Sequence, residues 1–106
     1  MPQKKIKIKY TPAAVDDMDE IFSYIAQENL AWAEEMLLKL NSKIGGLAEF
    51  PHMGSVLSED DFPLIQRGYR FIVVPPYLVF YRIINDTVVI HRILHGRRDY
   101  LRDLFS

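Results

Sequence analysis

Histidine and arginine side chains in the last third of the chain could together cleave or bind a phosphodiester. RNA cleavage needs a base to take the 2′-hydroxyl proton, cations to hold the scissile phosphate, and an acid for the leaving oxygen. His91 or His95 could act as the base, and Tyr100 or a histidine could act as the acid. The cations would be arginines: Arg70, Arg92, Arg97 and Arg98.

Alternation along a strand limits how many of these side chains can converge. His91 and His95 are expected on one face of the last strand, with Arg92 on the other. His91 stands between apolar neighbours on that face, which favours a partly buried structural role over a catalytic one. His95 ends the strand and is expected to be better exposed, and its structural alternative is a hydrogen bond that fixes the Gly96 turn.

The remaining arginines allow two interpretations. In the structural one, Asp99 caps a short terminal helix while Arg97 and Arg98 solvate the turn or pair with nearby carboxylates. In the functional one, they form a guanidinium patch that faces phosphates or an acidic protein surface. Arg70 and Arg82 fall on predicted strands, so each must point toward an open face or a partner. The binding candidates are Arg70, Arg82, Arg97, Arg98 and Tyr100.

The composition is that of a globular protein. The chain has 106 residues, of which 49% are hydrophobic and 25% charged, and we expect one domain over residues 1–106. There is no cysteine, which excludes disulfides and thiolate metal sites, and we expect neither a metal nor a cofactor. No apolar block is long enough for a signal peptide or membrane span, which predicts a cytoplasmic protein without a membrane partner.

Charge is divided along the sequence although the net charge is only −1. Residues 11–35 contain seven acidic side chains and no Lys or Arg, whereas all seven arginines lie between Arg67 and Arg102. Two solvated faces on a neutral domain would explain this division. We favour a basic working surface, which includes the turn from His95 to Arg98, opposite an acidic support.

A strand and a helical hairpin open the chain. Apolar residues alternate with lysines over residues 6–10, which predicts an edge strand. Thr11 offers an N-cap hydroxyl, Pro12 suits the first helical position, and Asp16 and Asp17 complement the helix dipole. The apolar stripe of this first helix is Val15, Met18, Ile21, Phe22 and Ile25. A second helix begins near Leu30, and its stripe is Trp32, Met36, Leu37, Leu40, Ile44 and Leu47.

A loop and a sheet follow the hairpin. Residues 50–66 are rich in turn formers and are expected to be the longest loop. Runs of branched and aromatic residues predict strands over 69–74, 77–84 and 87–94, with Tyr77, Phe80 and Tyr81 packed in the sheet. Asn85-Asp86 tolerates positive φ and makes the last two strands an antiparallel hairpin. The fold class is α+β: an N-terminal strand, an antiparallel two-helix hairpin, a three-stranded antiparallel sheet and a short C-terminal helix.

Several motifs occur in an order and spacing typical of one family. They are Tyr77-Leu-Val-Phe-Tyr81-Arg82-Ile, the later Val-Val-Ile-His-Arg-Ile-Leu-His95-Gly96-Arg97-Arg98-Asp99, the upstream Phe50-Pro51-His52-Met53-Gly54, and Arg70 seven residues before Tyr77. Together with the opening strand and the Asp-rich first helix, they make nearly the whole chain resemble the ParE/RelE superfamily of bacterial toxins. The resemblance implies the ParE/RelE fold and the toxin half of a type II toxin-antitoxin pair.

The superfamily has two branches with different actions. The resemblance implies either a ParE-like poison of DNA gyrase or a RelE-like ribosome-dependent mRNA endoribonuclease, in which His95, Arg70 and Arg97 would be catalytic. A pI near 6.3, an ending closer to ParE and the absence of any lysine after Lys43 favour the ParE-like branch. In that branch the protein acts by binding and is not an enzyme.

The resemblance also implies a partner. A cognate antitoxin is expected to form a hetero-oligomer with the chain, through a segment that folds over grooves between the helical hairpin and the sheet. A member of the family that only binds its antitoxin, without any toxicity, is a third possibility.

Overall fold

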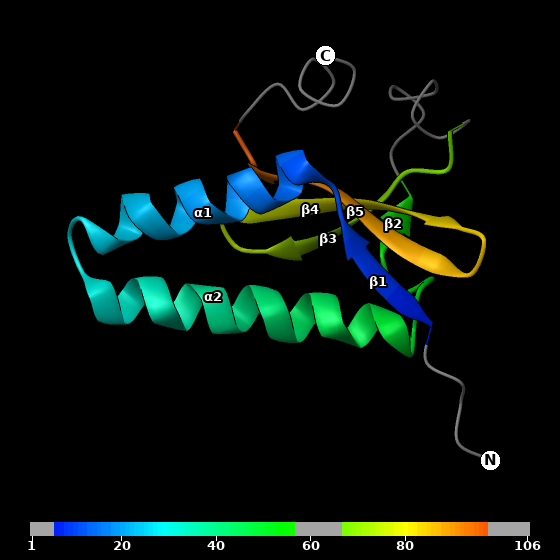
Figure 1. The fold of residues 1–106 in the computed structure, drawn as a ribbon, viewed down its shortest axis with the longest axis horizontal. Coiled ribbons are helices and arrows are strands. Elements are labelled where there is room, and N and C mark those ends of the chain that lie inside the picture. The colour runs from blue at the N-terminus through cyan, green and yellow to red at the C-terminus, as the bar shows by residue number, and fades with distance from the viewer. Residues whose placement is uncertain (1–5, 57–66, 98–106) are drawn as a thin grey trace.

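The computed structural model describes residues 6–56 and 67–97, which form two helices against one mixed sheet (Figure 1). The elements in chain order are β1 (Lys7–Tyr10), α1 (Pro12–Ala26), α2 (Leu30–Gly45), the 3₁₀ turn η1 (Gly46–Ala48), β2 (Ser55–Val56), β3 (Arg70–Val74), β4 (Tyr77–Ile84) and β5 (Thr87–His95). The predicted α+β class, the helical hairpin and the strands after it are confirmed. The predicted C-terminal helix and its Asp99 cap lie outside the described residues.

The sheet has five strands in the order β1-β5-β4-β3-β2. β1 is an edge strand, as predicted, and pairs in parallel with β5, whereas the other neighbours are antiparallel. Asn85 and Asp86 have φ values of 49° and 58°, so the β4–β5 hairpin turn is the predicted one. The prediction of a continuous loop over residues 50–66 was wrong at β2, because a strand of two residues is too short to give an alternating pattern.

Both helix starts are held by side-chain caps. Thr11 accepts a hydrogen bond from the Ala14 amide at 3.1 Å, as predicted. Asn29 does the same for α2 by accepting from the Trp32 amide at 3.0 Å. Among the described residues, no helix is long and apolar enough to cross a membrane.

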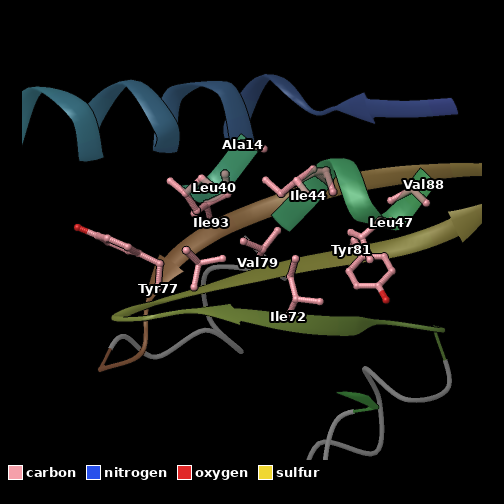
Figure 2. Close-up of a cluster of buried hydrophobic side chains, with 12 residues drawn as sticks. Ala14, Leu40, Ile44, Leu47, Ile72, Tyr77, Val79, Tyr81, Val88 and Ile93 are labelled. Atoms are coloured by element: carbon pink, nitrogen blue, oxygen red, sulfur yellow. The ribbon is translucent and has the colours of Figure 1, made fainter. Parts of the chain in front are cut away.

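The helices pack on one face of the sheet, where the core lies (Figure 2). Its buried members are Ala14, Leu40, Ile44, Leu47, Ile72, Val74, Tyr77, Val79, Tyr81, Val88, Ile90 and Ile93. Phe80 is also fully buried, and it lies against Phe71 with ring centroids 6.2 Å apart. The prediction that the aromatic residues of β4 serve sheet packing is therefore confirmed.

The predicted apolar stripes were wrong at two positions. Val15 is 47% exposed and Trp32 is 64% exposed, whereas Ala14 and Ala33, their neighbours in sequence, are buried. Small residues let each helix approach the sheet and the other helix closely, so the larger neighbour is turned outward. The pattern of large apolar residues alone gives too wide a stripe.

Asp17 ties α1 to β5. Its carboxylate accepts two hydrogen bonds from the Arg92 guanidinium, at 2.7 and 2.8 Å, and a third from the Ile93 amide at 2.9 Å. β1 pairs with β5 only as far as Ile90. The Asp17 carboxylate therefore accepts a hydrogen bond from a β5 amide that lies beyond the end of β1. The prediction that Asp16 and Asp17 complement the helix dipole was wrong, because neither lies in the first turn of α1.

Candidate functional site

A β-bulge in β5 separates the two candidate histidines. Phe80 pairs with Arg92 while Tyr81 pairs with Ile90, so His91 is an extra residue that shifts the alternation of the strand. His95 pairs with Tyr77 and shares the helix-covered face, whereas His91 lies on the opposite face. The predicted grouping of the histidines was therefore wrong, because His91 and His95 do not share a face.

His91 belongs to a polar cluster on the uncovered face. Arg82 donates its Nε–H to Nε2 of His91 at 3.2 Å, reaches the Arg67 carbonyl at 3.4 Å, and lies 4.9 Å from the centre of the Tyr69 ring. Burial and the positive charge of Arg82 both lower the pKa of His91. A neutral His91 can accept this hydrogen bond, which agrees with the structural role predicted for it.

Arg70 and Tyr81 hold the loop before β2, and we call this set of contacts the loop clamp. The Tyr81 hydroxyl donates to the Pro51 carbonyl at 2.7 Å and accepts from the Gly54 amide at 3.0 Å. Arg70 donates to the Gly54 carbonyl at 3.0 Å. Burial raises the pKa of Tyr81, opposed by the Gly54 hydrogen bond and the Arg70 charge. A Cβ at Gly54 would collide with the Tyr81 ring and hydroxyl, so glycine is required there.

The loop clamp and His95 lie at opposite ends of the sheet. Arg70 pairs with Tyr81 in β4, and His95 pairs with Tyr77, four residues away and roughly 13 Å along the strand. Figure 2 shows Tyr77 at one end of the core and Tyr81 well separated from it. The structure therefore does not bring His95 and Arg70 together.

The end of β5 brings His95 and Arg97 together. The Arg97 amide donates to Nδ1 of His95 at 3.1 Å, which confirms the hydrogen bond expected for the Gly96 turn, and the Arg97 residue is exposed. The His95 ring meets the Tyr77 ring edge to face at 5.8 Å. Arg98 and Tyr100 lie outside the described residues.

Two open pockets lie next to this end of the sheet, where grooves between the helical hairpin and the sheet were expected to receive an antitoxin. The first has a volume of about 540 Å³ and lies between α1 and the Tyr77–His95 pair, with Glu20 and Tyr24 on its wall. The second, of about 350 Å³, is lined by both helices and shares Tyr77 with the first. Trp32, an aromatic residue of a predicted apolar stripe that proves to be exposed, lines the second of them.

Metal ligands do not gather in the described part of the chain. Within residues 6–56 and 67–97, no three His, Asp or Glu side chains lie together in a way that could hold a metal ion. The polar groups that do meet there are bonded to each other or to the main chain.

Comparisons with known proteins place the chain in one family. Residues 8–100 match the family described as the ParE toxin of the type II toxin-antitoxin system parDE. Toxin RelE2 of Caulobacter vibrioides is 32% identical over 92 residues, which cover 87% of this chain and 97% of that protein. Toxin ParE3 of the same species is 32% identical over 89 residues, covering 83% of this chain and 84% of that protein.

Solved structures agree in fold. A chain from the chromosomal ParDE toxin-antitoxin system of P. aeruginosa has a TM-score of 0.69 at 20% identity, covering 88% of this chain and 98% of that one. A chain from the toxin-antitoxin complex RelBE2 of Mycobacterium tuberculosis has a TM-score of 0.54 at 24% identity, covering 86% and 98%. The family match, the two curated relatives and the shared fold give one conclusion. The chain belongs to the ParE/RelE superfamily of toxins from type II toxin-antitoxin systems.

Proposed function

We propose that this toxin acts in the cytoplasm by binding DNA gyrase, so that cleaved DNA persists, and that it does not cut mRNA. The observation that carries the proposal is the separation of His95 from Arg70 by roughly 13 Å along β4. A phosphodiester held by one of these residues is too far from the other for both to act on the same reacting atoms.

The bonding of the arginines supports the same proposal. Arg70 holds the loop before β2, Arg82 binds His91, and Arg92 binds Asp17. Recruiting any of them to a phosphate would break a contact that the fold uses. Arg97 is exposed, and we assign it, with Arg98 and Tyr100, to the surface that meets the target. Arg70 and Arg82 were also predicted to bind the target, and we now give them supporting roles behind that surface.

The second part of the proposal is a cognate antitoxin. The two solved relatives come from toxin-antitoxin systems, and the family match carries the same description. The pockets beside α1 and α2 give such a partner an apolar surface with few fixed polar groups. We therefore expect the active toxin to be neutralised as part of a hetero-oligomer.

Ribosome-dependent cleavage of mRNA is the second candidate. The contact between His95 and the Arg97 amide favours it, because an imidazole and a guanidinium could then lie near one phosphate, and a relative is named Toxin RelE2. Arg70 would have no part in such a site. The two candidates differ in what the purified protein does to each target.

Purified toxin should be tested on gyrase and on translation side by side. We expect inhibition of gyrase supercoiling with accumulation of cleaved DNA, and no cuts in mRNA bound to ribosomes by primer extension. Codon-phased cuts together with normal supercoiling would overturn the gyrase proposal. Expression without the antitoxin should slow growth. Unchanged growth at equal protein level would mean that the protein is not toxic and only binds its antitoxin.

A further inference from the structure

Adjoining pockets form one groove along the helical hairpin. The first pocket, beside α1, shares Pro76 and Tyr77 with the second, and the second shares Glu35 and Lys39 with a third of about 490 Å³ between α2 and β3. We call this continuous surface the hairpin groove. The groove continues from the end of β5, past the β3–β4 turn, to the last residues of β3, Val73 and Val74.

The groove is lined by exposed apolar side chains. Tyr24 is 74% exposed, Trp32 is 64% exposed and Leu38 is 69% exposed, and each belongs to a different one of the three pockets. Large apolar groups in one connected surface are typical of a protein interface. An occupant therefore needs apolar side chains along its whole length.

Charge at the groove differs between its two ends. Glu20 lies in the first pocket, at the end next to β5, and Lys43 lies in the third, at the end next to β3. Both residues are exposed, and neither has an ion-pair partner within residues 6–56 and 67–97. In the middle, the charges of Glu35 and Lys39 oppose each other at 3.9 Å.

The other acidic side chain of the first pocket is already bonded. The Asp17 carboxylate accepts hydrogen bonds from Arg92 and the Ile93 amide, so Glu20 is the acidic side chain of this pocket whose charge is not paired within the described residues. The aromatic rings of Tyr24 and Tyr77 lie in the same pocket, and their faces attract cations. This combination suits a lysine or arginine side chain, and the Lys43 end suits an aspartate or glutamate.

We propose that the hairpin groove binds one segment of the antitoxin in a fixed direction, set by charge. The basic part of the segment lies at Glu20 and Tyr24, its apolar part crosses Trp32 and Leu38, and its acidic part lies at Lys43. This inference rests on the toxin-antitoxin pairing proposed above. It adds the charge order that an antitoxin must carry, and so a reason why this toxin accepts one antitoxin and rejects others.

Charge reversal at the two ends tests the proposal. Glu20→Lys and Lys43→Glu should each weaken binding of the purified antitoxin by about 10-fold at low ionic strength, and the effect should shrink as salt is added. Asp19→Lys and Lys9→Glu are matched controls, because both residues are exposed and neither lines the groove; they should change the Kd by less than about 2-fold. Thermal unfolding of each variant checks that the fold is intact.

Two failures can be told apart. If the complex forms but the groove variants behave like the controls, the inferred direction is overturned and the pairing stands. If wild-type toxin does not bind the antitoxin at all, the pairing itself is overturned, and the inference with it.

Crosslinking tests the direction without relying on charge variants. A photoreactive p-benzoylphenylalanine in place of Tyr24 should capture an antitoxin peptide rich in Lys and Arg, and the same group in place of Leu38 should capture one closer to acidic residues. Both side chains are exposed, so these replacements should not disturb the fold. Capture of the peptides in the reverse order would overturn the proposal.

Discussion

Two regions of the sheet use polar and aromatic side chains in opposite ways: the Tyr81 end, where β3 begins at Arg70, and the Tyr77 end, where β5 ends at His95. At the Tyr81 end, the hydroxyl and the Arg70 guanidinium are bonded to main-chain groups of the loop before β2. At the Tyr77 end, Tyr24 is 74% exposed on the wall of an open pocket. The first end stabilises the fold, and the second leaves surface free for a partner.

This difference separates residues by what their loss should change. Substitutions at the Tyr81 end should lower the free energy of unfolding, since buried donors and acceptors would lose their partners. Substitutions at exposed positions of the Tyr77 end should alter binding while the protein stays folded. Residues that break this division are informative, and Asp17 is the clearest, because it lines the open pocket and is also buried and bonded.

The largest effect on stability is expected for Asp17→Ala. The change removes the carboxylate that accepts hydrogen bonds from the Arg92 guanidinium and the Ile93 amide. Loss of one partner from a mostly buried ion pair costs about 3 kcal/mol of folding free energy. Urea unfolding should show this loss, whereas Asp19→Ala, at an exposed position of the same helix, should change stability by less than about 0.5 kcal/mol. Equal stability of the two variants would show that Asp17 only lines the groove.

Removal of one tyrosine hydroxyl at the Tyr81 end and one at the Tyr77 end compares the contributions of the two ends to stability. Tyr81→Phe should cost about 2 kcal/mol, because the Gly54 amide and the Pro51 carbonyl both lose a partner. Tyr24→Phe should leave the free energy of unfolding unchanged, since that side chain is at the surface. Chemical denaturation of the two variants gives the comparison, and a similar cost in both would contradict it.

Much of the fold follows from local signals in the sequence. Thr11 and Pro12 mark the start of α1, and Asn85-Asp86 fixes the last hairpin, because caps and tight turns depend on a few adjacent residues. β2 could not be predicted, since it consists of two residues whose pairing with β3 is a tertiary contact. The parallel pairing of β1 with β5 is likewise decided by the whole sheet.

The candidate site was harder to predict, because one inserted residue changes it. The bulge at His91 moves His95 to the helix-covered face and leaves His91 on the other, so alternation gave the wrong grouping. The bonds of Asp17 to β5 and of Tyr81 to the Pro51 carbonyl join residues far apart in the chain. The sequence predicts the helix or strand in which Asp17 and Tyr81 lie, but it does not predict the distant residues that they contact.

Stability should depend on pH through His91, with a smaller effect than the Asp17 and Tyr81 substitutions. Its pKa is lowered in the folded protein from an ordinary value of 6.5, so the unfolded chain binds the proton more readily. The contribution of His91 to stability is therefore complete above pH 6.5 and is lost as the pH falls below it. The difference in urea midpoint between wild type and His91→Gln, followed from about pH 7.5 to about 5.5, isolates this group. A constant difference across that range would exclude the effect.

The smallest change in stability is expected at the turn after β5. In Arg97→Ala with Arg98→Ala, the main-chain amide of residue 97 can still donate to His95, so the free energy of unfolding should change by less than about 0.5 kcal/mol. Toxicity on expression without the antitoxin should nevertheless fall, because the exposed guanidinium of the proposed target surface is gone. Growth curves at equal protein level measure this loss.

A charge-preserving variant shows which property of these two arginines matters. Lysine keeps the positive charge but lacks the planar fork of a guanidinium, so Arg97→Lys with Arg98→Lys should retain toxicity only in part if bidentate contacts hold the target. Full toxicity of the lysine variant would mean that charge alone is needed. Unchanged killing by the alanine variant would remove these arginines from the target surface, and the open end of the sheet would then serve the antitoxin alone.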